Sequence, residues 1–138
     1  MNSAPFAPGR PLTTHRGLPA GPSAARHARL TAQRLLAACG GLCPDAVAAD
    51  ILLIVSELAT NACLHAAPPY ALTVGVDEGY ACVAVSDASD RLPGRTGRPE
   101  GLPSHGRGLE IVRGLGADLY VSRSDHGKQV IAVLTWPP

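Results

Sequence analysis

The chain has 138 residues, of which 46% are hydrophobic, and a formal net charge of +1 at pH 7. A chain of this length can bury a core of its own, and its apolar content excludes global disorder. The small net charge also argues against direct nucleic-acid binding, which calls for a strongly basic surface.

The N-terminal part is predicted to hold a flexible arm and one helix. Residues 1–21 are rich in Pro and form the arm, in which residues 10–17 are a candidate edge strand. Ser23 is a candidate N-cap for a helix over residues 24–39. The pair Gly40–Gly41 ends this helix, because glycine tolerates the left-handed conformation that commonly follows a helix.

A longer helix is predicted from Asp45, its candidate cap, to about Ala66, before two prolines. From Ile51 to Val55 every residue is apolar, so this section is expected to be covered on more than one side. The apolar residues with the 3.6-residue spacing of a helix that packs on a sheet are Val47, Ile51, Val55, Leu58 and Ala62.

The second half of the chain alternates between strands and a short helix. Strands are predicted at residues 70–78, 81–87, 117–124 and 127–136, and a helix at residues 107–116. Residues 88–105 form a polar stretch rich in Gly and Pro, whose length is typical of a lid over a site. This order indicates an α+β two-layer sandwich, in which helices cover one face of a mixed, mostly antiparallel sheet. Residues 22–138 are expected to form this single domain.

The cysteines and the N-terminus indicate a cytoplasmic protein. The four cysteines stand among apolar neighbours and are expected to be reduced core thiols. Cys39 and Cys43 have C-x3-C spacing, but no second Cys/His pair follows at finger spacing, which disfavours zinc. The first residues contain no apolar leader, and no run approaches the ~20 residues of a membrane span, so no membrane contact is predicted.

Glu57 and Asn61 lie one turn apart on the longer helix, so their side chains point the same way. No Lys or Arg lies between Arg34 and Arg91, and burying a carboxylate without a partner is costly. Either this face opens to solvent, with Asn61 capping a local group, or a bound group uses these oxygens. Magnesium is one such group, since it takes one or two protein oxygens and completes its shell with water and phosphate.

Two further motifs are less specific. Asp87 ends a predicted strand, where its carboxylate either starts a turn or accepts a hydrogen bond from an exocyclic amine such as that of adenine. Gly106 and Gly108 flank Arg107 where a helix begins, and glycine there lets backbone N–H groups approach a phosphate. A dinucleotide-binding G-x-G-x-x-G motif is excluded, because Ile111 stands at its third glycine.

In chain order, the motifs are a helix with Glu-x3-Asn, a strand ending in Asp, a long polar stretch, Gly-x-Gly at a helix, and Gly-Lys before the last strand. This order resembles the ATP-binding fold shared by gyrase-type ATPases, ninety-kilodalton heat-shock chaperones, sensor histidine kinases and DNA-mismatch-repair ATPases, the GHKL family. The phrases VSELATNACLHA, GRGLEIV and GKQVIAVL look most similar to the short, single-domain anti-sigma-factor serine kinases of actinobacteria.

The resemblance implies a catalytic and metal-binding role for the longer helix. Glu57 would be the general base that activates the attacking hydroxyl. Asn61 would hold Mg²⁺, which bridges the phosphates of ATP. His65, one turn beyond Asn61, is a further candidate for contact with phosphate or metal.

The resemblance also implies where ATP would lie. Asp87 would bind the amino group of adenine, with Lys128 as a further candidate near the base. The lid would order on binding, and His105 before the glycine motif is another candidate contact. The residues expected to close over the phosphates are Gly106, Arg107, Gly108 and Leu109.

The implied function is that of an ATP-binding regulator with protein serine kinase activity. Its partners would be a sigma factor or similar regulator and an antagonist protein that it phosphorylates on serine, and the resemblance implies a homodimer. The alternative is a non-catalytic partner-switching module that binds nucleotide weakly or not at all. It is favoured by two departures from the family: Ala88 and Ser89 follow Asp87 in place of Gly-x-Gly, and Lys128 stands where Thr is common.

Overall fold

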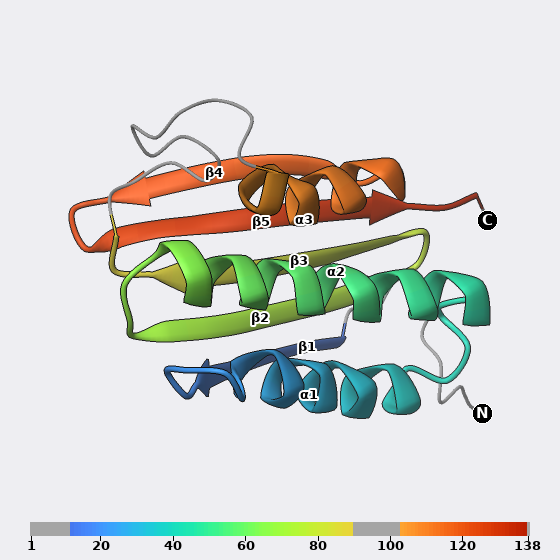
Figure 1. The fold of residues 1–138 in the computed structure, drawn as a ribbon. Coiled ribbons are helices and arrows are strands. Elements are labelled where there is room, and N and C mark those ends of the chain that lie inside the picture. The colour runs from blue at the N-terminus through green and yellow to red at the C-terminus, as the bar shows by residue number, and fades with distance from the viewer. Residues whose placement is uncertain (1–11, 90–102, 138) are drawn as a thin grey trace.

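The computed structural model describes residues 12–89 and 103–137. In chain order the elements are β1 (Leu12–Leu18), α1 (Ala24–Ala38), α2 (Asp45–His65), β2 (Tyr70–Asp77), β3 (Tyr80–Asp87), α3 (Pro103–Gly114), β4 (Asp118–Ser124) and β5 (Gly127–Thr135). Within this part of the chain, three helices form one layer in front of a five-stranded sheet (Figure 1). The predicted α+β sandwich, with helices on one face, is therefore confirmed.

The sheet has the strand order β1-β2-β3-β5-β4, and all of its described pairings are antiparallel rather than mixed. β1 and β4 lie at the two edges. In β3 and β5 the register places Asp87 opposite Lys128, at the end of one strand and the start of the other. Residues far apart in the sequence therefore meet at one end of the sheet.

The core forms because the strands alternate and the helices present apolar stripes. In β2 every second residue is buried, including Leu72, Val74 and Val76, as expected for a sheet covered on one face. α2 lies between α1 and α3 over the sheet, which buries Ile51 and Ile54 in its apolar section (Figure 1). The expectation of cover on more than one side is thus met.

The helix ends differ from the predictions. Ser23 precedes α1 but its side chain makes no capping hydrogen bond, whereas its carbonyl accepts one from the N–H of His27. Asp45 is not a cap: Pro44 holds the cap position, and Asp45 is the first helical residue, where its charge suits the positive end of the helix dipole. α3 begins at Pro103 rather than at residue 107, so that Gly106 and Gly108 lie inside the helix.

α2 has 21 residues, and an 18-residue window within it has a mean hydropathy of 1.7, so by length and composition alone it could cross a membrane. The prediction that no segment reaches that length was therefore wrong. The core helix of a soluble protein meets the same criterion. α2 also packs on the sheet and on two helices here, which buries Ile51, Ile54 and Val55, whereas Leu53 and Leu64 are exposed.

Candidate active site

The candidate residues gather at one end of the molecule. The C-terminal part of α2, the end of β3 and the start of β5 lie together there (Figure 1). Glu57 and Asn61 come from α2, Asp87 from β3 and Lys128 from β5. The fold thus brings to one end of the molecule elements whose candidate residues the sequence spreads over 72 positions.

Glu57 lies against α3. A Cβ atom added to Gly108 would stand 2.8 Å from Glu57 Oε1, and the Glu57 carbonyl oxygen would be 4.0 Å away. A glycine at this position therefore leaves room for the carboxylate where α2 and α3 pack together. Glu57 and Asn61 are both half-buried, so their face opens to solvent rather than being enclosed.

Among the described residues, the Glu57 carboxylate has no hydrogen-bond or ion-pair partner, and the Asn61 amide has no hydrogen-bond partner. Among the described residues, no three His, Cys, Asp or Glu side chains come together as a metal site. This donor set fits magnesium that is held by one or two protein oxygens and otherwise by water and phosphate. It does not fit a metal enclosed by protein ligands alone.

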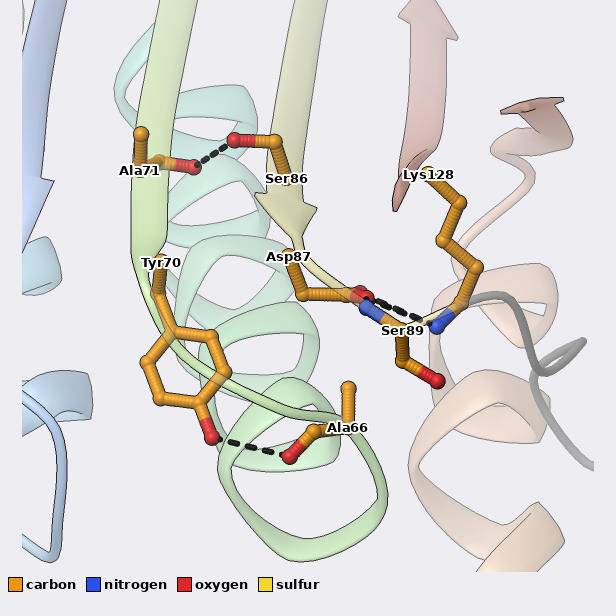
Figure 2. Close-up of polar contacts among 7 residues, drawn as sticks. All are labelled: Ala66, Tyr70, Ala71, Ser86, Asp87, Ser89 and Lys128. Atoms are coloured by element: carbon orange, nitrogen blue, oxygen red, sulfur yellow. Dashed lines mark hydrogen bonds and ion pairs between the residues drawn. The ribbon is translucent and has the colours of Figure 1, made fainter. Parts of the chain in front are cut away.

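Asp87 and Lys128 form a buried ion pair. Lys128 Nζ lies 3.0 Å from Asp87 Oδ2 and 3.1 Å from Oδ1, and the two side chains are only 3% and 2% exposed (Figure 2). The backbone N–H of Ser89 donates a further hydrogen bond to Asp87 Oδ1, at 2.7 Å. The carboxylate expected to bind adenine is therefore already bonded at both oxygens.

The segments around this pair are held tightly. Gly127 has φ +142°, and a Cβ atom there would overlap the carbonyl oxygen of Asp87, so only glycine fits. The N–H of Ala88 donates to the carbonyl of Ala67 at 2.8 Å, which ties the end of β3 to the segment after α2. The backbone at Asp87 is thus held by both neighbouring segments.

Tyr70 is a residue of this region that the sequence did not single out. It is buried, and its hydroxyl donates to the carbonyl of Ala66 at the end of α2, at 2.9 Å (Figure 2). Burial raises the pKa of Tyr70, and the negative charges of Cys63 and Asp87 raise that pKa further. The sequence does not predict this contact, because any large apolar side chain could occupy a buried position of an alternating strand.

The glycine motif lies within α3 rather than before it. Gly106 and Arg107 are helical, as is His105, so the backbone N–H groups of Gly106 and Arg107 are positioned for bonds within the helix. Contact of these N–H groups with a phosphate would need the first turn of α3 to open. The predicted lid falls largely on residues 90–102, which lie outside the described residues.

Leu109 and His65 occupy different surroundings. The Leu109 side chain is buried in the hydrophobic core, so any contact with a nucleotide would come from its main chain. His65 is the last residue of α2 and is half-buried. It therefore lies at the same end of the molecule as Asp87.

A cavity of about 380 Å³ also opens near Asp87. Among its lining residues are Ser86, Ser122 and Gln129, which are register partners in adjacent strands. Because they alternate with the buried Asp87 and Lys128, their side chains lie on the sheet face away from the helices. Asp87 and Lys128 also line this cavity, which therefore adjoins the ion pair and does not include Glu57.

The comparison with protein families decides what this arrangement is. The histidine kinase-like ATPase domain matches residues 18–134, a span that contains all the candidate site residues. The chain belongs to this family. The resemblance to the GHKL ATPases is thereby confirmed, and the family assignment indicates an ATP-binding, regulatory domain. No curated protein matches the chain.

Two solved structures are similar to this histidine kinase-like domain. The blue-light activated histidine kinase of Erythrobacter litoralis EL346 has a TM-score of 0.51 and 32% identity, over 67% of this chain and 31% of that chain. The histidine kinase domain from the same kinase has a TM-score of 0.48 and 33% identity, over 64% of this chain and 44% of that one. The chain thus spans less than half the length of either, and the first likeness agrees with the fold described above.

Proposed function

We propose that this protein is a cytoplasmic, ATP-binding regulator of the anti-sigma-factor serine kinase type. It would bind a sigma factor or a similar regulator, and it would use Mg-ATP to phosphorylate a serine on a small antagonist protein. The observation that carries the proposal is the pair Glu57 and Asn61 on α2, beside Gly108 of α3, within a histidine kinase-like ATPase domain.

The geometry of α2 suits phosphoryl transfer. This reaction needs positioning and charge neutralisation more than covalent chemistry. The Glu57 carboxylate would accept the proton of the attacking serine hydroxyl, and its contact with α3 at Gly108 limits the positions that it can take. Asn61, one turn further on, would hold the magnesium. Magnesium bound with the nucleotide neutralises phosphate charge.

The partners are proposed from the same resemblance. The half-buried Glu57 carboxylate, which has no partner within the described part of the chain, can reach a hydroxyl presented by another protein, whereas an enclosed carboxylate could not. A serine on a docked antagonist therefore fits the openness of this face better than a small-molecule acceptor that needs a closed pocket. A homodimer would leave this face free only if the subunits met elsewhere.

The test uses an antagonist candidate that forms a stable complex with the chain. With radiolabelled ATP and Mg²⁺, the expected product is phosphoserine on the antagonist, and Glu57→Ala is expected to abolish it. Glu110→Ala removes an exposed glutamate from α3 and serves as the matched control, with activity unchanged. Complex formation with ATP bound and no phosphoserine would overturn the kinase proposal.

A non-catalytic partner-switching module is the second candidate function. The observation that favours it is the ion pair between Asp87 and Lys128, which occupies the carboxylate expected at the base. Calorimetric titration with Mg-ATP separates the two candidates. Micromolar binding (roughly −8 kcal/mol) supports the kinase, and the absence of heat together with partner binding supports the module.

A further inference from the structure

Asp87 and Lys128 are the buried charged residues of the described part of the chain. Replacing a buried ion pair by apolar residues is often neutral or stabilising, so such a pair is a poor device for stability. Removing one partner alone is different, because it leaves a buried charge without compensation. A carboxylate kept at the end of β3 therefore needs Lys128 whenever no other group bonds to it.

The ammonium is a strong competitor for the carboxylate. Lys128 Nζ bonds to both oxygens of Asp87, and the Ser89 N–H takes a further lone pair of Oδ1. The Lys128 ammonium adds the attraction of a full opposite charge to its hydrogen bonds with the carboxylate, and a neutral donor such as an exocyclic amine lacks this attraction. A purine amino group would thus approach an acceptor that a stronger donor already holds.

Lys128 is also fixed beside Asp87 by the backbone. The two residues are register partners in adjacent strands. Gly127, immediately before Lys128, fits against the carbonyl of Asp87 with no room for a side chain. The pairing is therefore set by the sheet and does not depend on a mobile segment.

We propose that Lys128 is an internal ligand of the base-binding carboxylate. Before a nucleotide binds, its ammonium occupies Asp87, so the amino group of adenine must compete with it. Lys128 thereby lowers the affinity for ATP and removes the preference for adenine over a purine that lacks the amino group. This inference deepens the proposed function and rests on its placement of the base at Asp87.

The test compares ATP with inosine triphosphate, in which a carbonyl replaces the amino group of the base. Both are titrated calorimetrically, with Mg²⁺, into the unmodified chain, Lys128→Thr and Lys128→Met. Methionine keeps most of the length of the side chain without its charge, so that one variant folds if threonine proves too small. Arg113→Met, which removes an exposed cation from α3, controls for general loss of positive charge.

In the unmodified chain, ATP and inosine triphosphate are expected to bind within about threefold of each other. In either Lys128 variant, ATP binding is expected to tighten at least tenfold, with inosine triphosphate changed by less than threefold. Arg113→Met is expected to show neither effect.

Two results would overturn the inference. One of them leaves the proposed function intact, and the other overturns it as well. If the unmodified chain already prefers ATP tenfold, or if Lys128→Met weakens ATP binding, Lys128 does not compete with the base, and the proposed function stands. If neither the unmodified chain nor a folded Lys128 variant binds ATP, the base site at Asp87 fails, and the proposed kinase fails with it.

Discussion

Gly108 of α3 leaves the space that the Glu57 carboxylate of α2 occupies, since a Cβ atom at residue 108 would stand 2.8 Å from Glu57 Oε1. The nearest atom is the far end of a side chain, so a larger residue would displace the carboxylate rather than the helix. The contact links the catalytic candidate to the glycine motif, although 51 positions separate them.

Gly108→Ala is expected to separate activity from stability. Alanine favours a helix over glycine by up to about 1 kcal/mol, so the free energy of unfolding should stay the same or rise by up to about that amount. The displaced carboxylate should reduce serine phosphorylation by about 10- to 100-fold. Gly114→Ala, in the same helix with no atom near its added Cβ, is the control and should leave activity unchanged. Equal activity in the two variants would remove Glu57 from the reaction.

Asn61→Ala is expected to weaken magnesium-dependent ATP binding roughly tenfold (about 1.4 kcal/mol). The Asn61 amide makes no hydrogen bond to a described residue, so the free energy of unfolding without nucleotide should change by less than about 0.5 kcal/mol. Calorimetry with and without Mg²⁺, beside urea unfolding, measures both. Thr60→Ala, at an exposed neighbouring position, is the control. A large loss of stability would show that Asn61 is structural.

Asp87→Ala is expected to destabilise the fold by about 3–5 kcal/mol, because it leaves the Lys128 ammonium buried without a partner. Adding Lys128→Met should recover most of this loss, since the pair is then replaced by apolar groups. Urea unfolding of Asp87→Ala, Lys128→Met and the double variant gives the interaction free energy between the two side chains. Additive losses would contradict the pairing. Because Asp87→Ala is expected to be less stable, its ATP binding is measured only after its folding has been verified.

Gly127→Ala is expected to cost more than about 2 kcal/mol, because φ is +142° and the added Cβ would overlap the Asp87 carbonyl oxygen. The atoms that the added Cβ would meet belong to the backbone, which cannot move aside as the end of a flexible side chain can. Gly17→Ala in β1 is the matched control, since no atom lies within 4 Å of its added Cβ. Thermal unfolding of both variants measures the difference, and similar melting temperatures would refute the account of Gly127.

Cys43 is expected to be unreactive at neutral pH. Burial, together with a smaller effect of the negative charges that Cys39 and Asp45 can carry, raises the pKa of its thiol to about 11. The pKa rises from an ordinary value of 9.0, so the unfolded chain loses this proton first as pH rises. The stability contributed by the neutral thiol is present below pH 9 and is lost between about pH 9 and 11.

Alkylation followed by mass spectrometry measures the reactivity of Cys43 at pH 7.5. Urea unfolding at pH 8 and pH 10.5 measures the loss of stability with rising pH. Cys43→Ala should show a smaller loss of stability over that interval. Rapid alkylation of Cys43 in the folded chain at pH 7.5 would contradict the expectation.

The sequence determined by itself which segments form helices and strands, because those patterns are local. Alternation at Leu72, Val74 and Val76 indicated a strand covered on one face, and the apolar run of α2 indicated a covered helix. The spacing of Glu57 and Asn61 also placed them on one face, since helix geometry relates positions one turn apart. The motif order then pointed to the family that residues 18–134 match.

Only the tertiary structure decided what these residues touch. Lys128 reaches Asp87 across 41 positions because β3 and β5 pair in one register, and a shift by one residue would place the ammonium on the other face of the sheet. Glu57 meets Gly108 because α2 and α3 pack side by side. Such contacts depend on the whole sheet and helix layer, so no local pattern of residues encodes them.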